Sequence, residues 1–376
     1  FSAFLVEDAI RTVGDSETPN FQERNLELNK LTKLTRDQGN AYINMERVGD
    51  LINVASNQGN KLDLGKSGFQ DLKITDDIIN LSGFTFLEDN NEYLNLFAGL
   101  NGAAFDMAEI IPNNTSWAFH FSSKDPVSFG SKLNAHFLKN NPEVIKVQER
   151  LLRDYEFDVK HTFTLIDEEI GLMTLESTVT GNQNELLVLE TKDMGEALRF
   201  FNSVAERDMQ STGDTLYKEQ FGDYDIRKLP AKQFPYALLG NVAKGFDDCF
   251  YLQYRNYLVF SNSLQQLKNL TFSIQDEATW TKSIRINRFL ERTNQESNLS
   301  LYVNTPRSWN QLLKMLKPVW QEQFRANEFS LKNLEFMAFQ FSAVDDKFYT
   351  NVNLYQPDLP KRNIPDRITE LNSLTV

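Results

Sequence analysis

The chain has few of the residue types from which catalytic and metal sites are most often built. Its 376 residues include one cysteine, Cys249, and three histidines, His120, His136 and His161. One cysteine cannot form an intramolecular disulfide or a cysteine-based zinc site. The apolar run at 249–252 predicts a buried, inert thiol. The histidines lack the spacing of an HExxH or His-x-His ligand set.

Common enzyme motifs are also missing. The segment nearest to a phosphate-binding loop, residues 59–67, has five residues between its glycines instead of four, and no apolar strand precedes it. Neither a Gly-x-Ser-x-Gly elbow nor a Gly-x-Gly-x-x-Gly fingerprint occurs. The sequence therefore predicts no catalytic, cofactor-binding or metal-binding residue, and no cofactor.

Long hydrophobic runs and excess positive charge are the remaining absences. No run of about 18 apolar residues occurs, so we expect no transmembrane segment in this chain. Acidic residues outnumber basic ones by 52 to 39, which gives a net charge of -13 and a pI near 4.9. This balance argues against a nucleic-acid partner and against an anionic membrane surface. The 41% hydrophobic content predicts well-filled cores, and the length predicts two or three units.

Two stretches with the same pattern, residues 40–52 and 299–313, organise the rest of the chain. In each, an alternating strand ends in Asn, and an Arg lies just before an amphipathic helix. The apolar residues at i, i+3, i+4 and i+7 are Val48, Leu51, Ile52 and Ala55 in the first helix, and Trp309, Leu312, Leu313 and Leu316 in the second. The shift of about 260 residues predicts an internal duplication.

A hairpin with an acidic turn follows each helix, at Asp76-Asp77 and at Asp345-Asp346. Weaker strand-helix-hairpin units are expected around the strands at 117–121 and 186–190, and the former has a third acidic segment at 167–169. Acidic pairs also suit acid–base or calcium chemistry, but their repeated place between strands favours turns. The predicted fold class is α+β, in which repeated βαββ-like units form antiparallel sheets covered by helices.

These patterns divide the chain into four parts. Residues 1–110 are the first copy, truncated at its N-terminus, with a helical connector; 111–260 contain two weaker units; 261–356 are the second copy; and 357–376 are a linker tail. Helices are expected within 5–39 and at 47–55. Because the counterpart of Phe1 one period later follows a complete strand, we expect a fragment cut just after an upstream strand.

Several short segments resemble a family of exported bacterial proteins of unknown function, often followed by a β-propeller-like region. They are residues 5–11, 40–44, 81–86, 111–115 and 257–263. The resemblance implies a cell-envelope protein, periplasmic or membrane-anchored, with an N-terminal targeting or anchoring segment outside this chain. It brings no catalytic residues.

The leading functional prediction is a non-enzymatic envelope module that acts as a scaffold or protein-interaction domain. Its partner would be another envelope protein or a C-terminal domain of the same chain. The alternative is a hydrolase or glycan-binding protein with a site between units, in which His120, His136, Asp106, Glu109 and the acidic turns would converge. A lipid carrier, the third possibility, needs an apolar cavity. His120 is out of phase with Trp117, Phe119 and Phe121, which predicts that it lies on an outer face.

Overall fold

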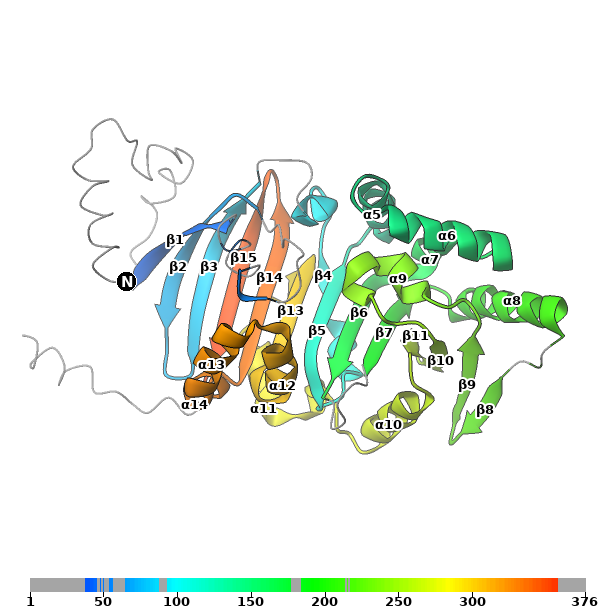
Figure 1. Cartoon of the computed structure of the whole chain (residues 1–376). Helices are drawn as coiled ribbons and strands as arrows, with labels where there is room; N and C mark the ends of the chain where they lie inside the picture. The colour runs from blue at the N-terminus through cyan, green and yellow to red at the C-terminus, as the bar shows by residue number, and fades with distance from the viewer. Residues whose placement is uncertain are drawn as a thin grey trace, which may run out of the picture.

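The computed structural model describes residues 38–45, 48, 50, 54–56, 65–87, 93–176, 184–213, 215 and 217–357. These residues form a mixed α and β fold built on one large antiparallel sheet (Figure 1). The order of its thirteen strands is β1-β2-β3-β15-β14-β13-β5-β6-β7-β11-β10-β9-β8. The α+β class and the antiparallel pairing predicted from the sequence are therefore confirmed. The helices expected within 5–39, most of the helix at 47–55 and the tail beyond 357 lie outside the described residues.

Fifteen strands occur in the described part of the chain. They are β1 (Gly39–Asn44), β2 (Ser67–Ile74), β3 (Ile78–Phe86), β4 (Ala103–Ala104), β5 (Thr115–Ser122), β6 (Ile166–Leu175), β7 (Glu185–Thr191), β8 (Lys218–Phe221), β9 (Tyr224–Leu229), β10 (Cys249–Tyr254), β11 (Tyr257–Ser261), β12 (Glu296–Ser297), β13 (Leu299–Asn304), β14 (Phe336–Val344) and β15 (Lys347–Tyr355). The two short strands β4 and β12 pair with each other, outside the large sheet.

The helices connect these strands. The α-helices of the described part are α5 (Pro126–Asn140), α6 (Pro142–Tyr155), α7 (Thr162–Leu165), α8 (Met194–Thr212), α9 (Phe234–Leu239), α10 (Leu264–Gln275), α11 (Ile284–Leu290), α12 (Thr305–Met315), α13 (Pro318–Ala326) and α14 (Glu328–Lys332). Short 3-10 helices are η1 (Tyr93–Phe97), η2 (Asp106–Glu109), η3 (Val159–His161), η4 (Gly240–Ala243) and η5 (Trp280–Lys282).

Both faces of the central strands are buried, in two separate cores. Strand β7 shows the division, because Leu187 and Leu189 belong to one core and Leu186 and Val188 to the other. Helices α5, α6, α8 and α9 contribute to the first core, and η2, α10, η5 and α11 to the second. A strand covered on both faces has no outer face, so the prediction for His120 is wrong: this side chain on β5 is 1% exposed.

Two of the three acidic segments are turns, as predicted. Asp76-Asp77 joins β2 to β3, and Asp345-Asp346 joins β14 to β15. The third prediction is wrong, because residues 167–169 lie inside β6, where the pairing with β7 is irregular between Ile166 and Ile170. The residues before them form helix α7 rather than a strand. An acidic pair is compatible with an irregular strand as well as with a turn, and the sequence pattern does not separate the two.

Strands β1–β3 and β13–β15 have matching pairing registers. Tyr42 pairs with Phe69, and Tyr302 pairs with Ala338. Tyr302 lies 260 positions after Tyr42, and Ala338 lies 269 positions after Phe69. Phe69 also pairs with Phe84, as Ala338 does with Asn353, again 269 positions later. The two sets of strands adjoin through β3 and β15 in the large sheet (Figure 1).

Candidate functional site

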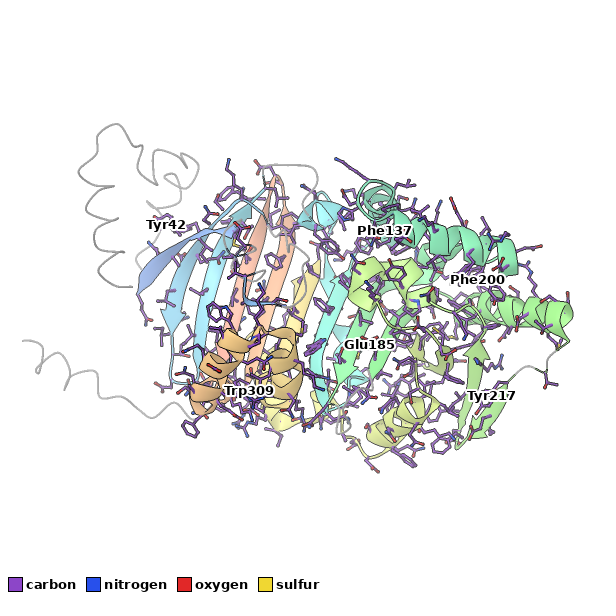
Figure 2. All side chains as sticks on the ribbon, viewed as in Figure 1. Tyr42, Phe137, Glu185, Phe200, Tyr217 and Trp309 are labelled. Carbon is purple, nitrogen blue, oxygen red and sulfur yellow. The ribbon has the colours of Figure 1, made fainter. Side chains whose placement is uncertain are left out.

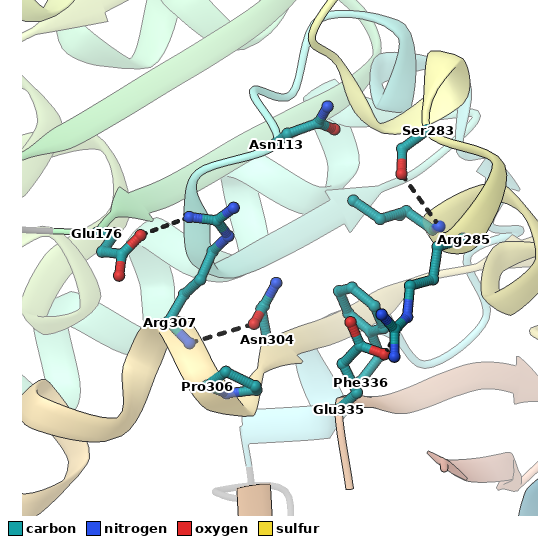
Figure 3. A pocket seen from close by; sticks show the side chains of 10 residues that line it. Asn113, Glu176, Ser283, Arg285, Asn304, Pro306, Arg307, Glu335 and Phe336 are labelled. Atoms are coloured by element: carbon teal, nitrogen blue, oxygen red, sulfur yellow. Dashed lines mark hydrogen bonds and ion pairs between the residues drawn. The ribbon is translucent and has the colours of Figure 1, made fainter. Parts of the chain in front are cut away.

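A polar groove lies where β13 and β14 meet the segments that flank β5 and β6. Its larger hollow has a volume of about 450 Å³ (Figure 3). Asn304 ends β13 and Phe336 begins β14, whereas Asn113 precedes β5 and Glu176 follows β6. Residues far apart in the sequence therefore line one space.

One wall of this hollow carries an ion pair at the start of α12. Asn304 caps the helix, because its side-chain oxygen accepts a hydrogen bond of 3.2 Å from the backbone N–H of Arg307. The Arg307 guanidinium forms an ion pair with Glu176 (Figure 3). The two side chains are 37% and 40% exposed, so water screens the pair and its contribution to stability is about 0–1 kcal/mol.

A second ion pair lies across the hollow. Nε of Arg285, in the first turn of α11, is 2.5 Å from Oε2 of Glu335, which immediately precedes β14. The backbone N–H of Thr305 donates a hydrogen bond of 2.9 Å to the carbonyl oxygen of Glu335. The start of β14 is therefore tied to both α11 and α12, and the guanidinium of Arg285 stays at the surface, 55% exposed.

A smaller hollow of about 230 Å³ continues the first. It shares Arg285, Pro306 and Glu335 with the larger hollow and adds Lys332 and Gln356. Nζ of Lys332 is 2.5 Å from Oε1 of Glu328 and 5.3 Å from the ring centre of Trp309, whose position Figure 2 shows. The hydrogen bond from Lys332 lowers the pKa of Glu328. We call the two hollows together the strand-end groove.

Large apolar side chains stand exposed on the helices that border the strand-end groove. Ile284, on α11, is 75% exposed, and Phe329, on α14, is 80% exposed. Val319, on α13, is 71% exposed, but this helix packs against α12 and α14 and lines neither hollow. Neither α13 nor α14 has a buried side chain. Exposed apolar groups beside a concave polar surface are typical of contact surfaces.

A second group of polar residues is enclosed under η2. The carboxylate of Glu169, on β6, is 2% exposed and accepts a hydrogen bond from the backbone N–H of Met107 at 2.9 Å. Nε2 of His120 lies 2.9 Å from its Oε1, and the Tyr257 hydroxyl donates to Oε2 at 3.3 Å. The ring of Phe105 covers His120, with ring centres 4.7 Å apart. This arrangement satisfies a buried charge and fixes η2 on the sheet.

Burial perturbs two further carboxyl groups, both on β7. Desolvation raises the pKa of Glu185 from 4.5 to about 7. The pKa of Glu190 also rises to about 7, first through desolvation and then through the charge of Glu169. Glu190 accepts a hydrogen bond of 3.0 Å from the side chain of Asn256. Neither carboxyl lines the strand-end groove.

The other residues considered from the sequence do not line the strand-end groove. The Asn140 side chain lies 3.1 Å from Nδ1 of the partly exposed His136, and desolvation lowers the pKa of this histidine. The exposed His161 lies against Phe200, with ring centres 5.0 Å apart. Glu109 forms an ion pair of 2.5 Å with Arg255, and Asp106 is exposed. Of these residues, His120 and Glu169 are in direct contact and are buried. Asp106 and Glu109 belong to η2, which lies over this pair, and the charges of Glu109 and Glu169 both act on the Tyr257 hydroxyl.

The cysteine is buried, as the apolar run around it predicted. Cys249 is fully buried, and desolvation raises the pKa of its thiol. Among the described residues, no group of three or more His, Cys, Asp or Glu side chains is arranged to hold a metal ion. No helix of the described part is long and apolar enough to cross a bilayer.

The residues of the strand-end groove were not identified from the sequence as a site. Arg307 was noted only as the Arg that precedes a repeated helix, and Arg285, Glu176 and Glu335 gave no motif. A usable signal existed at 282–292, which contain Lys282, Arg285, Arg288 and Arg292 but only one carboxylate. This local excess of positive charge stands out in a chain of net charge -13.

Comparison with known proteins gives little. No protein-family model matches the chain, and no curated protein matches it. Two solved structures are similar to it, crystal forms III and IV of TP0453, each at 9% sequence identity and a TM-score of 0.28. The alignments cover 71% and 69% of this chain and 85% and 82% of the other. Likeness at this level supports no conclusion about this chain.

Proposed function

We propose that this chain is a non-enzymatic module of the cell envelope that binds a partner protein through the strand-end groove and its apolar border. The observation that carries the proposal is the exposure of Ile284 and Phe329 on the two helices that supply Arg285 and Lys332 to this groove. The polar groups considered for catalysis support it indirectly, because His120 and Glu169 are enclosed and hold η2 in place. The envelope location rests on the resemblance of short segments to exported proteins.

A photo-crosslinking experiment tests the proposed contact. A benzoylphenylalanine at position 329 of the full-length protein should give one discrete adduct in the envelope fraction. The same group at position 152, where Leu152 on α6 is 50% exposed, should give none. An excess of the purified parent chain, added before irradiation, should prevent formation of the adduct. An excess of the purified chain with Phe329→Ser should not prevent it. Equal labelling at both positions, or a protein found only in the cytosolic fraction, would contradict the proposal.

A glycan-binding or hydrolytic role is the second candidate, and one observation favours it. The lining of the groove comes from the second predicted copy and, through Asn113 and Glu176, from the segment with the weaker units, so the space lies between units. Its arginines, carboxylates and amides suit sugar hydroxyls. However, the aromatic side chain in the lining, Phe336, is 4% exposed and offers no open stacking face. Binding of neutral oligosaccharides in a glycan array, abolished by Asn304→Ala, would favour this candidate over the protein partner.

We further propose that β1–β3 and β13–β15, with the helix predicted at 47–55 and its counterpart α12, descend from one duplicated unit. The matching registers support this, and so do two contacts between residues at equivalent positions. Ser82 pairs with Asn351, 269 positions later, and Ser56 bridges to Leu316, 260 positions later. A chimera in which residues 336–355 replace the equally long 67–86 should keep the parental circular dichroism spectrum. An unfolded chimera would count against the duplication.

A further inference from the structure

We infer that the occupant of the strand-end groove is an extended, acidic segment of the partner protein that carries apolar side chains. This inference rests on the proposed function and names the chemistry of the partner. Its first support is shape. The two hollows share Arg285, Pro306 and Glu335, so they follow one another without a break. A continuous groove that passes from β13 to the end of β15 fits a polypeptide chain better than a compact ligand.

The second support is the charge of α11, which borders both hollows. Arg285, Arg288 and Arg292 recur at i, i+3 and i+7, which places them along one side of the helix and the turn after it. All three are exposed. Arg288 and Arg292 form no ion pair with a described residue. Lys332 adds a cation from the opposite border.

The molecule as a whole is acidic, so the group of cations at α11 is a local exception. A chain with 52 acidic and 39 basic residues repels an acidic partner over most of its surface. Attraction is restricted to a place where cations gather, so electrostatics orients such a partner on the strand-end groove. The carboxylates there, Glu176, Glu328 and Glu335, are each engaged with a basic side chain. The guanidinium groups retain further N–H donors for an incoming carboxylate.

The third support is the apolar border. Ile284 immediately precedes Arg285, and Phe329 lies one helical turn before Lys332, so each apolar side chain accompanies a cation. A partner with alternating acidic and apolar residues satisfies both kinds of group in an extended conformation, because successive side chains point in opposite directions. Arg285 and Lys332 line the hollows, where an extended polypeptide reaches them better than the flat surface of an anionic membrane does. Arg288 and Arg292 line neither hollow and lie beside them, on α11 and in the turn that follows it.

Fluorescence anisotropy with synthetic peptides tests the inference. The probe is a fluorescein-labelled eight-residue peptide of alternating Asp and Leu, and the protein is the complete chain. We expect saturable binding that weakens as salt is added. The peptide with Lys in place of each Asp should not bind. The peptide with Ser in place of each Leu should bind roughly tenfold more weakly, which corresponds to a loss of about 1.4 kcal/mol of binding free energy.

Matched variants locate the binding. Arg288→Glu and Ile284→Ser should each weaken binding of the Asp-Leu peptide by roughly five- to tenfold, whereas Arg153→Glu on the exposed surface of α6 should leave it unchanged. Arg288 and Ile284 were chosen because neither supports the fold through a described ion pair or buried contact, so both variants should melt as the parent does. Equal binding of the Lys-Leu peptide, or equal loss in Arg153→Glu, would overturn the inference.

The outcomes separate this inference from the proposed function. Binding to phosphatidylglycerol vesicles but not to the Asp-Leu peptide would mean that the strand-end groove contacts a lipid surface and not a polypeptide. A specific crosslink at position 329 without affinity for the acidic peptide would retain the proposed function and reject the acidic partner. Absence of both would reject the two together.

Discussion

Charged side chains are used in opposite ways in two regions of the molecule. In the strand-end groove, Arg307 and Glu176 form an ion pair while both remain well hydrated. Under η2, Glu169 pairs with His120 in almost complete isolation from water. An exposed pair contributes little to stability and can exchange partners at small cost. A buried pair is expensive to break, because the remaining group stays uncompensated. The first arrangement suits binding, and the second suits architecture.

The comparison would be tested most severely by removing the buried carboxylate. Glu169→Ala leaves the Met107 N–H, the His120 ring and the Tyr257 hydroxyl without their acceptor. We expect a loss of about 3–5 kcal/mol in the free energy of unfolding, measured by urea denaturation. Glu143→Ala, on the surface of α6, is the control and should change it by less than about 0.5 kcal/mol. A loss below about 1 kcal/mol in Glu169→Ala would remove the architectural role.

Glu185 offers a contrast within the buried region, because it has no compensating charge. Its folded pKa of about 7 lies above its usual value of 4.5, so the folded state favours the protonated carboxyl. The stability that this protonation provides is complete below pH 4.5 and is lost as the pH rises through 7. The change amounts to about 3 kcal/mol over this interval.

Glu185→Gln removes this titration. As the pH is raised from 4.5 to 8, the free energy of unfolding of the variant should increase relative to that of the parent. The difference between the two proteins should become constant at the alkaline end of this range. Urea denaturation at a series of pH values measures it. A constant difference between the two proteins across this range would show that Glu185 titrates normally. Figure 2 shows the position of this side chain on β7.

The exposed pair should respond far less. Arg307→Ala removes the partner of Glu176 and should cost about 0.2–1 kcal/mol of stability, and this cost should shrink in high salt. Thermal melting at low and high ionic strength provides the measurement. A loss of several kcal/mol in the free energy of unfolding that does not depend on salt would show that Arg307, like Glu169, stabilises the fold. The two regions would then not differ in their use of charge.

The smallest effect is expected at the apolar border. Phe329→Ser changes a side chain that is 80% exposed on a helix with no buried residues, so stability should stay within about 0.5 kcal/mol of the parent. Trp309→Ala, at a site 3% exposed on the neighbouring α12, is the matched comparison and should cost about 3–5 kcal/mol. Comparable losses in the two variants would mean that Phe329 packs against the protein rather than facing a partner.

Local patterns in the sequence predicted the antiparallel hairpins and two of their acidic turns. Such features depend on neighbouring residues, because alternation and turn chemistry act over a few positions. The position of His120 depends on what covers β5, and η2 and its neighbours come from elsewhere in the chain. The phase of His120 was read correctly as opposite to that of Phe121, but the second face is also a core.

The strand-end groove could not be predicted from the sequence for the same reason. Its larger hollow combines Asn113, Glu176, Arg285 and Arg307, which no local spacing relates. Only the order of strands brings β5 between β13 and β6, and thereby places these residues together. The sequence did contain the cationic spacing of α11, but a basic helix alone does not reveal which hollow it borders.

The seam between β3 and β15 has a consequence for synthesis of the chain. Ile78 pairs with Tyr355 and Phe86 with Lys347, so β3 must wait for a strand whose residues are made 261 to 277 positions later. Pairings so distant in sequence close slowly, because the intervening chain must first be confined. During that interval one side of β3 exposes backbone donors and acceptors to any passing strand. During translation the chain is therefore vulnerable to aggregation through β3 until β15 has been made.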